Sequence, residues 1–403
     1  MMSKKSPQLR FEGFTDDWEE RKLGDVLSER NDQTPETNEY PLMSFVQGKG
    51  VTPKGERYNR SFLVKDSEKK YKKTELGDFI YSSNNLETGS IGFNRTGKAV
   101  ISPVYSIFES KKSRESQFIG IMSARKDFIS KMVRFRQGVV YGQWRIHESD
   151  FLNIDMKMPN DKEQQLIISF FENIDKTIAL HQRKLDLLKE QKKGYLQKMF
   201  PKNGAKVPEL RFAGFADDWE QRKLEELGNL NRGKSKHRPR NDSRLFGGEY
   251  PFIQTGDVAK APLFLTEYSQ TYSEFGIQQS KLWDIGTLLI TIAANIADTT
   301  ILGIKAVFPD SVIGFESTSC DVVFIKNYID IQSDLLKRKA ETSSQANLNL
   351  AKLKEMNLNI PKLKEQQKIG SFFKQLDDTI ALHQRKLDLL KEQKKGFLQK
   401  MFV

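Results

Sequence analysis

The chain is built from two halves that repeat each other at their ends. Residues 177–200 and 379–402 are identical at 23 of 24 positions, 202 residues apart in a chain of 403. A second pair of segments, 7–23 and 208–224, is identical at 13 of 17 positions. The stretches between these ends, roughly 28–150 and 229–350, show almost no such likeness. A repeat of this kind sets the architecture, so we expect a constant frame around two variable middles that do one job on two different targets.

The charge balance favours a polyanionic partner. Lysine and arginine number 65 against 53 aspartates and glutamates, which gives a net charge of +12 and a pI of about 9.4. Such an excess is typical of proteins that bind nucleic acid, although a basic protein that is merely soluble would show it too. The hydrophobic content of 37% and the mean hydropathy of −0.59 suit small domains joined by long helices better than a compact enzyme.

Cysteine content and apolar runs exclude several classes of protein. Cys320 is the only cysteine, so an intrachain disulfide and a cysteine-based zinc site of the usual spacing are excluded. The first residues, MMSKKSPQLRFEGF, lack the apolar core of a signal peptide. The most apolar stretch, 285–304, is interrupted by Asn295 and Asp298 and is too short to span a bilayer. We therefore expect a cytoplasmic protein.

A long helix is predicted from Asn160 to just before Pro201. Asn160 is a candidate N-cap, and Glu163 follows three residues later in the capping-box position. Apolar residues then alternate spacings of three and four, which is a heptad seam, and the second half repeats the pattern. A helix of about 39 residues is about 58 Å long, and its apolar stripe needs a partner helix. The predicted helix-pairing residues are Phe171, Ile174, Ile178, Leu185, Leu188, Phe373, Leu376, Ile380, Leu387 and Leu390.

Two polar residues also fall in the seam, His181 and Lys192, and their copies are His383 and Lys394. We interpret them as positions that set the register of a coiled coil, because His181 has no second metal ligand at helical spacing. The two helices could pair with each other or with helices of another subunit. Joining the ends of the chain would make the halves interchangeable. We therefore favour two antiparallel helices within one chain, with one globular domain at each end.

The variable middles are predicted to be mixed α/β domains. Short apolar runs at 75–83, 98–108 and 285–293 are bounded by Gly, Asn, Pro and Ser, a pattern typical of strands and turns. The predicted fold is α+β, with two mixed α/β domains joined by two long antiparallel coiled-coil helices in a pseudo-twofold repeat. The predicted boundaries are 1–158 for the first domain, 159–200 for the central helical region, 201–358 for the second domain and 359–403 for the distal helical region.

Catalytic signatures are missing from the sequence. It contains no Walker-type phosphate loop, no dinucleotide GxGxxG, no nucleophile elbow, no HEXXH and no Asn/Asp-Pro-Pro-aromatic motif of amino-methyltransferases. The nearest approach to a nuclease cluster is Asp66, Glu68 and Lys70, in a hydrophilic run where a solvated charged face is the better interpretation. We therefore predict that this chain has no catalytic residue and no metal site of its own.

Nucleic-acid binding is the stronger hypothesis. Lysine and arginine contact phosphates, while arginine, asparagine, glutamine and lysine read base edges. Each middle carries such residues on turn-like segments; each one alone is more simply an ordinary surface residue. Together with the charge balance and the two divergent middles, they predict sequence-specific binding of double-stranded DNA. The predicted DNA-binding residues are Arg57, Asn84, Asn85, Arg95, Gln143, Arg145, Arg232, Lys234, Lys236, Arg238, Arg240, Asn295 and Gln345.

Three repeated motifs carry a resemblance to a known family. They are LRFxGFxDDWExRKL at 9–23 and 210–224, KEQQxIxxFF at 162–171 and 364–373, and the two IALHQRKLDLLKEQKKGxLQKMF helices. With them, the whole chain resembles the specificity subunit of a type I restriction-modification enzyme. The resemblance implies a non-catalytic subunit whose two target-recognition domains bind a bipartite DNA site. It does not identify the residues that contact bases, because the recognition domains are the parts that differ within the family.

The same resemblance implies the partners. The long helices would dock two modification (methyltransferase) subunits, and restriction subunits would then join for ATP-dependent cleavage. S-adenosylmethionine, ATP and Mg²⁺ are expected in those partner subunits, and no cofactor is expected in this chain.

Two other classes of function stay open at this point. The alternative is an architectural coiled-coil protein that binds nucleic acid without sequence preference, although such binding would not require two different middles. A self-contained restriction enzyme is disfavoured by the missing motifs.

Overall fold

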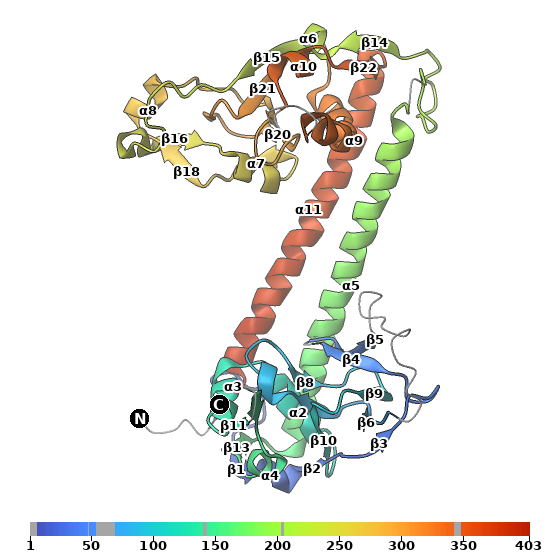
Figure 1. The fold of residues 1–403 in the computed structure, drawn as a ribbon, viewed down its shortest axis with the longest axis vertical. Coiled ribbons are helices and arrows are strands. Elements are labelled where there is room, and N and C mark those ends of the chain that lie inside the picture. The colour runs from blue at the N-terminus through green and yellow to red at the C-terminus, as the bar shows by residue number, and fades with distance from the viewer. Residues whose placement is uncertain (1–5, 47, 54–68, 140–142, 203–204, 342–347) are drawn as a thin grey trace. The chain divides into compact units, whose positions relative to one another are not determined.

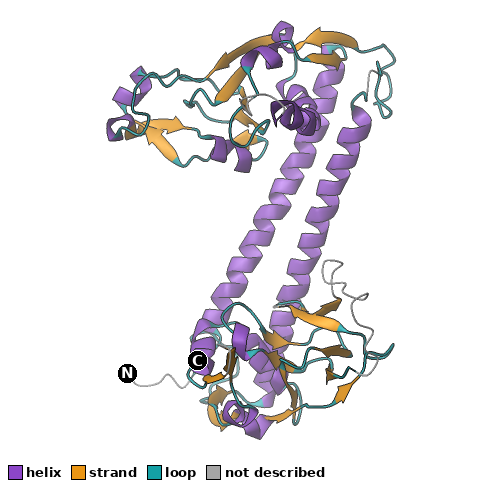
Figure 2. Ribbon diagram, in the orientation of Figure 1, coloured by secondary structure: helices purple, strands orange, loops and turns teal. Residues whose placement is uncertain are grey.

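The computed structural model describes residues 6–46, 48–53, 69–139, 143–202, 205–341 and 348–403. They form two compact units, one of Met1–Leu180 with Leu387–Val403 and the other of His181–Lys386. Two long helices, α5 (Asp161–Met199) and α11 (Leu363–Lys400), each contribute one end to each unit (Figure 1). The remainder of each unit mixes short strands with short helices (Figure 2). The α+β fold class with two long helices is confirmed.

The first unit is organised around a four-stranded antiparallel sheet in the order β2-β10-β7-β8. Its strands are β1 (Glu19–Lys22), β2 (Leu27–Glu29), β3 (Gln33–Thr34), β4 (Met43–Val46), β5 (Gly50–Pro53), β6 (Tyr71–Thr74), β7 (Phe79–Tyr81), β8 (Ile91–Phe93), β9 (Ala99–Ile101), β10 (Ser106–Ser110), β11 (Gln137–Val139), β12 (Gln143–Arg145) and β13 (Asp155–Met158). Its short helices are α1 (Leu23–Val26), the 3₁₀ turn η2 (Ser83–Asn85), α2 (Glu115–Met122), α3 (Lys126–Val133) and α4 (Glu148–Leu152).

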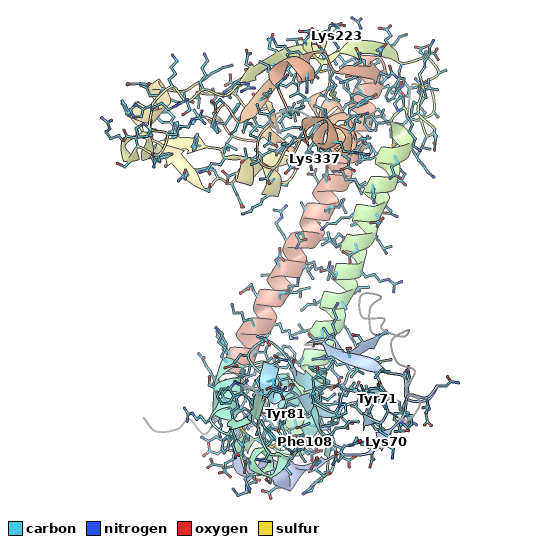
Figure 3. All side chains as sticks on the ribbon, in the orientation of Figure 1. Lys70, Tyr71, Tyr81, Phe108, Lys223 and Lys337 are labelled. Carbon is cyan, nitrogen blue, oxygen red and sulfur yellow. The ribbon has the colours of Figure 1, made fainter. Side chains whose placement is uncertain are left out.

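The predicted strands of the first middle are confirmed. The run 75–83 contains β7, and the run 98–108 contains β9 and the start of β10. Both β7 and β8 are buried along their whole length because their two faces are covered. In the core, Tyr81 stacks on Phe108 with ring centroids 5.9 Å apart; both residues are labelled in Figure 3. Contacts of this kind between aromatic rings add to the stabilisation that burial provides.

The second unit has a five-stranded sheet in the order β15-β21-β19-β20-β17, in which only β17 and β20 are parallel. Its strands are β14 (Glu220–Lys223), β15 (Gly228–Arg232), β16 (Phe246–Phe252), β17 (Phe264–Leu265), β18 (Gln270–Tyr272), β19 (Leu288–Thr291), β20 (Thr299–Leu302), β21 (Val312–Ser317) and β22 (Asn357–Ile360). Its short helices are α6 (Leu224–Leu227), η4 (Ser243–Leu245), α7 (Thr255–Lys260), α8 (Glu274–Gln278) and α10 (Leu350–Lys354), and it also contains the 20-residue helix α9 (Val322–Glu341).

The two units share a sheet order despite their dissimilar sequences. The order β2-β10-β7-β8 of the first unit matches β15-β21-β19-β20 of the second. The predicted strand at 285–293 is confirmed as β19, the counterpart of β7. The hairpin turn between β7 and β8 therefore corresponds to the turn between β19 and β20. This correspondence lets the two variable middles be compared element by element.

A buried ion pair ties each domain to the start of a long helix. Nε and Nη2 of Arg10 both donate to the Glu163 carboxylate at 2.8 Å, and Arg211 binds Glu365 in the same way at 2.7 Å. The N-cap prediction is confirmed, because the Asn160 side chain accepts from the Glu163 N–H at 3.0 Å. The side chain of Glu163, predicted at a capping-box position, is bound by Arg10. The repeated Arg and Glu of the sequence motifs are thus partners in space.

Aromatic contacts also recur between the halves. Trp18 lies 6.2 Å from Phe402, and Trp219 lies 6.3 Å from Phe200, in both cases at close to a right angle. Phe402 and Phe200 are the last aromatic residues of the two repeated segments. The end of each long helix is therefore part of the hydrophobic core of a unit.

Within each unit the two long helices are antiparallel. In the first unit the partners are Phe170 with Phe397, at 4.9 Å between ring centroids, and Asp175 with Lys394, at 2.5 Å. In the second unit they are His181 with His383, Lys192 with Asp377 at 2.6 Å, and Tyr195 with Phe372 at 5.0 Å. The partner's number falls as the helix number rises, which is the antiparallel pattern. The predicted seam residues are buried or half-buried, whereas most other positions on these helices are exposed.

The polar seam residues contact the opposite helix. Lys192 and Lys394 bind Asp377 and Asp175, which are themselves copies 202 residues apart. The ring nitrogens Nδ1 of His181 and His383 lie 3.4 Å apart. A one-residue slip would separate both charged pairs. These contacts support the interpretation of the polar positions as register-setting.

Candidate nucleic-acid interface

In the first unit, two distant segments form one polar surface. The strands β11 and β12 pair as a two-stranded antiparallel ribbon, and β12 is exposed along its length. The ribbon lies against η2 because the Asn84 side chain accepts from the Trp144 N–H at 2.6 Å and Ser83 Oγ accepts from the Ile146 N–H at 3.0 Å. Four predicted DNA-binding residues come together here: Asn84, Asn85, Gln143 and Arg145. We call this set, together with Trp144, the ribbon surface.

The side chains of the ribbon surface are suited to polar recognition. Asn84, Asn85 and Gln143 are exposed amides, which can both donate and accept hydrogen bonds. Arg145 is more than half exposed and lies 3.6 Å from Glu148, a loose ion pair that DNA could replace. Trp144 was not among the predicted residues. It could have been recognised in the sequence because it stands between two predicted residues, Gln143 and Arg145.

Arg95, another predicted residue of this domain, does not join the ribbon surface. Arg95 donates to Asp175 of α5 at 2.8 Å and lies 4.1 Å above the ring of Phe93. Its guanidinium is therefore engaged by the protein in this structure, and its visible role is to hold the turn after β8 against α5. Arg57 lies outside the described residues.

In the second unit, the predicted cations begin at Arg232, the last residue of β15, and continue along the segment that follows it. We call Arg232, Lys234, Lys236, Arg238 and Arg240 the basic segment; all five are exposed. Its backbone is anchored near its middle, since the Lys236 N–H donates to the Gln279 carbonyl and the Ser280 hydroxyl donates to the Lys234 carbonyl at 2.7 Å. Anchoring fixes the path of the chain while leaving the charged side chains in solvent.

A small polar cluster supports the basic segment. Nε2 of His237 and Oδ2 of Asp242 lie 2.8 Å apart, and Arg244 binds the same carboxylate at 2.7 Å. Hydrogen bonds from the Arg244 side chain and backbone, and then from His237, hold the pKa of Asp242 well below its usual value. The carboxylate thus stays charged and keeps the segment in place. Within the part of the chain that the structure describes, Arg240 is bound to Asp310 at 2.6 Å, while Arg232, Lys234 and Lys236 have no carboxylate partner.

Asn295, another predicted residue of the second domain, occupies a turn equivalent to one that contributes to the ribbon surface. Asn295 is exposed in the turn between β19 and β20, where Asn84 and Asn85 stand in the first domain, and its amide donates to the Thr255 carbonyl at 3.4 Å. Leu348 donates its N–H to the Ile292 carbonyl next to that turn, as Ile146 donates to Ser83. Gln345 and Gln143 both stand three residues before these anchors, but Gln345 lies outside the described residues.

The described residues bear on the metal and nuclease candidates of the sequence. No group of three or more His, Cys, Asp or Glu side chains within them could hold a metal ion. Of the weak nuclease candidates, Asp66 and Glu68 lie outside the described residues, and Lys70 is an exposed side chain. No helix among the described residues is long and apolar enough to cross a membrane.

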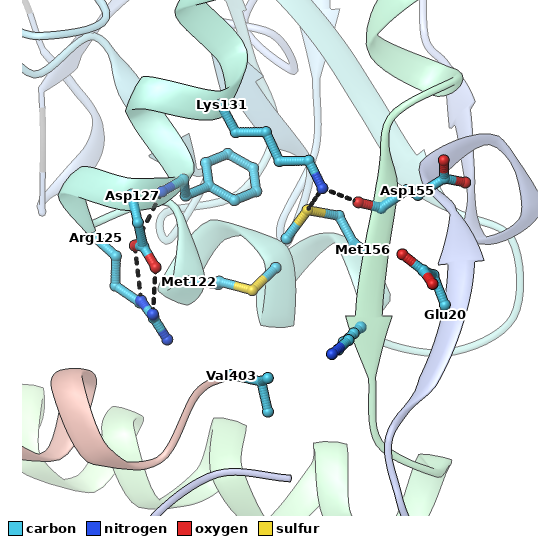
Figure 4. A pocket seen from close by; sticks show the side chains of 10 residues that line it. Glu20, Met122, Arg125, Asp127, Lys131, Asp155, Met156 and Val403 are labelled. Atoms are coloured by element: carbon cyan, nitrogen blue, oxygen red, sulfur yellow. Dashed lines mark hydrogen bonds and ion pairs between the residues drawn. The ribbon is translucent and has the colours of Figure 1, made fainter. Parts of the chain in front are cut away.

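A hollow in the first unit has balanced charges. Three basic residues, Arg125, Lys131 and Lys157, line it with three acidic ones, Glu20, Asp127 and Asp155 (Figure 4). Arg125 binds Asp127, and Lys131 donates to the Asp155 carbonyl. Since these opposite charges offset one another, the hollow is a poor site for a polyanion.

Comparison with known families identifies the chain. A family model described as the type I restriction modification DNA specificity domain matches it twice, at residues 15–190 and 216–392. The chain belongs to this family. It is a DNA-recognition (specificity) subunit of a type I restriction-modification system, with two target-recognition domains.

Individual relatives are distant in sequence but match over nearly the whole chain. A provisionally named type I restriction enzyme MjaX specificity subunit of Methanocaldococcus jannaschii is 20% identical over 420 residues, covering 95% of this chain and 92% of its own length. The crystal structure of a type I restriction-modification S subunit from M. genitalium matches with a TM-score of 0.67 at 14% identity and 99% coverage of both chains. A chain from a structure of type I restriction-modification complex assembly matches with a TM-score of 0.52 at 16% identity, covering 96% and 97%. These structures support the fold.

Proposed function

We propose that this specificity subunit is non-catalytic and that each of its domains reads one half of a bipartite DNA site. One observation carries the proposal: the two halves repeat their frame contacts and differ in their candidate DNA surfaces. The ribbon surface of the first domain is polar and aromatic, whereas the basic segment of the second domain is strongly cationic. Recognition of two different half-sites requires two equivalent frames that carry two different DNA-binding surfaces.

The partner subunits follow from a second repeated feature. Leu180 and Leu187 are exposed on α5, seven residues apart and so on one face of the helix; their copies Leu382 and Leu389 are exposed on α11. Exposed leucines in pairs favour burial by another protein. We assign each pair as part of a docking site for one modification subunit, which gives two such subunits per chain. Restriction subunits then join the assembly.

The chemistry belongs to those partners in this proposal. S-adenosylmethionine, ATP and Mg²⁺ would be bound by the modification and restriction subunits. The purified chain alone is therefore expected to show no methyltransferase, nuclease or ATPase turnover. Turnover that co-purifies with this chain and not with a contaminant would overturn the non-catalytic assignment.

The decisive experiment is a domain exchange. Residues 28–150 are replaced by the corresponding segment of a relative, and the chimaera is expressed with the cognate modification subunit. Sequencing of methylated sites in the host DNA should then show one half-site changed and the other kept. The reciprocal exchange of 229–350 is the matched control and should change the other half-site.

The outcomes separate the candidate functions. A change of both half-sites by one exchange would contradict the assignment of one domain to one half. Binding that no sequence competitor affects would instead favour the alternative, an architectural protein that binds nucleic acid without sequence preference.

A further inference from the structure

One tryptophan differs from the other three in its surroundings. Trp18, Trp219 and Trp283 are 4%, 3% and 0% exposed and belong to hydrophobic clusters. Trp144 is 48% exposed, although it lies in a strand of the ribbon. A large indole left half in solvent costs free energy that burial against a partner would recover.

The ribbon geometry leaves the indole uncovered. Trp144 stands directly opposite Gly138 in the antiparallel pairing, so the residue across from it has no side chain to cover the indole. A Cβ atom placed on Gly138 would meet nothing within 4 Å, so the space beside the glycine is open. Because side chains alternate along a strand, Gln143 and Arg145 lie on the other face of the ribbon. The ribbon therefore presents an aromatic face and a polar face to solvent.

The backbone of Trp144 is held in place. Its N–H donates to the side chain of Asn84. Two residues later, the N–H of Ile146 donates to the hydroxyl of Ser83. Ile146 itself is buried and connects the ribbon to the domain core. A position fixed in this way loses little backbone freedom when a partner covers the indole, which favours binding.

We propose that the β11–β12 ribbon enters the major groove of the first half-site and that Trp144 is its apolar contact with the bases. This inference rests on the proposed function. The major groove of B-form DNA admits a two-stranded ribbon, and its base edges include the apolar methyl group of thymine. Gln143 and Arg145, on the other face of the ribbon, stay available for polar contacts with the walls of the groove.

The contact is specific to the first half of the chain. In the sequence, Trp144 stands two residues before the anchor Ile146, whereas the residue two positions before the anchor Leu348 is an alanine, Ala346, which lies outside the described residues. Loss of the indole should weaken recognition of the first half-site and leave the second unchanged.

The first test uses the fluorescence of this residue. The subunit, assembled with its modification subunit, is titrated with acrylamide, free and bound to a duplex selected by the wild-type assembly from random sequences. The difference between wild type and Trp144→Phe isolates the signal of Trp144. We expect this signal to be quenched strongly in the free assembly and protected on the selected duplex. Equal quenching with and without that duplex would overturn the proposal.

The second test uses variants with a matched control. Trp144→Ala should lower affinity for the selected duplex by roughly ten-fold, because burial of the indole against the base edges is lost. Trp144→Phe should restore part of that loss, and Val104→Ala, which also changes an exposed apolar residue of this domain, should have no effect. Methylated-site sequencing should show relaxation confined to the first half-site.

The results also separate this proposal from the proposed function. If the wild-type assembly selects no preferred sequence, the proposed function itself fails. If it selects a bipartite sequence but Trp144→Ala binds and methylates like wild type, only the role of Trp144 fails.

Discussion

The two halves of this subunit make the same contacts in the frame and different ones in the domains. The ion pair of Lys192 with Asp377 recurs as Lys394 with Asp175, each shifted by 202 residues. The segments after the equivalent strands β2 and β15, by contrast, are unlike. After β2, Arg30 is held by Asp78 at 2.9 Å and by Glu109, and burial raises the pKa of Asp78 to about 6. After β15 comes the exposed basic segment.

This difference shows where the sequence is constrained by packing. Frame residues such as Arg10 and Glu163 are buried against each other, so a change in one leaves the other charge without a partner. Residues on the domain surfaces lie in solvent, where substitutions cost little stability. A duplicated chain can therefore change its DNA surfaces while it keeps the helices and their register.

Charges placed in the helix seam should give the largest effect and should affect both halves equally. Leu185 and Leu387 are copies, each only 1% exposed. Leu185→Asp and Leu387→Asp should each destabilise the chain by several kcal/mol, about 3–5, because each places an unpaired charge in a packed seam. Chemical denaturation measures the loss. Leu187→Asp, on the exposed side of the same helix, is the control and should change stability by less than about 1 kcal/mol. A large loss for only one of the two seam variants would show that the halves are not equivalent.

Removal of one partner of the buried frame pair should rank second. Arg10→Ala and Arg211→Ala should each cost about 3 kcal/mol, because each leaves a buried glutamate without its bidentate partner. The exposed pair of Arg21 with Glu19 gives the control, and Arg21→Ala should cost less than about 1 kcal/mol. Adding Glu163→Gln to Arg10→Ala should recover part of the loss. No recovery would mean that Arg10 acts through packing and not through charge.

The sequence predicted the frame well because its signals are periodic and repeated. The heptad spacing gave the length of α5, and Asn160 gave its start. The antiparallel arrangement was predicted because joining the ends of the chain would make the two halves interchangeable. Repeated motifs do not state their own partners, however. The pairing of Arg10 with Glu163 joins positions 153 residues apart and became visible only when the chain was folded.

The candidate DNA surface was harder to predict. Asn84 and Gln143 were chosen for their chemistry, but their proximity depends on a hydrogen bond from the backbone of Trp144. Arg95 has the same chemistry and a similar turn-like setting, yet its guanidinium is bound to Asp175. Residue type indicates what a side chain can bind. It does not indicate whether that side chain is already bound by another residue of the protein.

The basic segment offers a test of the asymmetry between the domains. Replacing its five cations together should reduce the slope of log affinity against log salt by up to about 4.5, since each neutralised phosphate contributes about 0.9. The control is the triple variant Lys202→Gln, Lys206→Gln and Lys362→Gln. These exposed lysines belong to the same unit and are paired with carboxylates. The salt slope is measured by titration at several ionic strengths. A slope unchanged by the five replacements would show that the basic segment faces away from DNA.

The smallest expected effect concerns the histidine pair, the one polar seam contact in which the repeated residue meets its own copy. Partial desolvation, then the charge of Lys386 and the neighbouring His383, lowers the pKa of His181. The unfolded chain, with a histidine pKa of about 6.5, therefore binds the proton more tightly than the folded chain does.

The stability that depends on neutral His181 should be fully present above about pH 6.5 and should be lost as the pH falls through the lower pKa of His181 in the folded state. Melting temperatures at about pH 7.5 and about pH 5.5 measure the effect, and we expect the wild type to lose a few degrees more than His181→Gln with His383→Gln. The difference between wild type and variant removes the contribution of the other titrating groups. If both proteins lost the same amount, the histidine pair would hold the register through packing alone, and the Lys–Asp pairs would be the only charged contacts of the seam that set it.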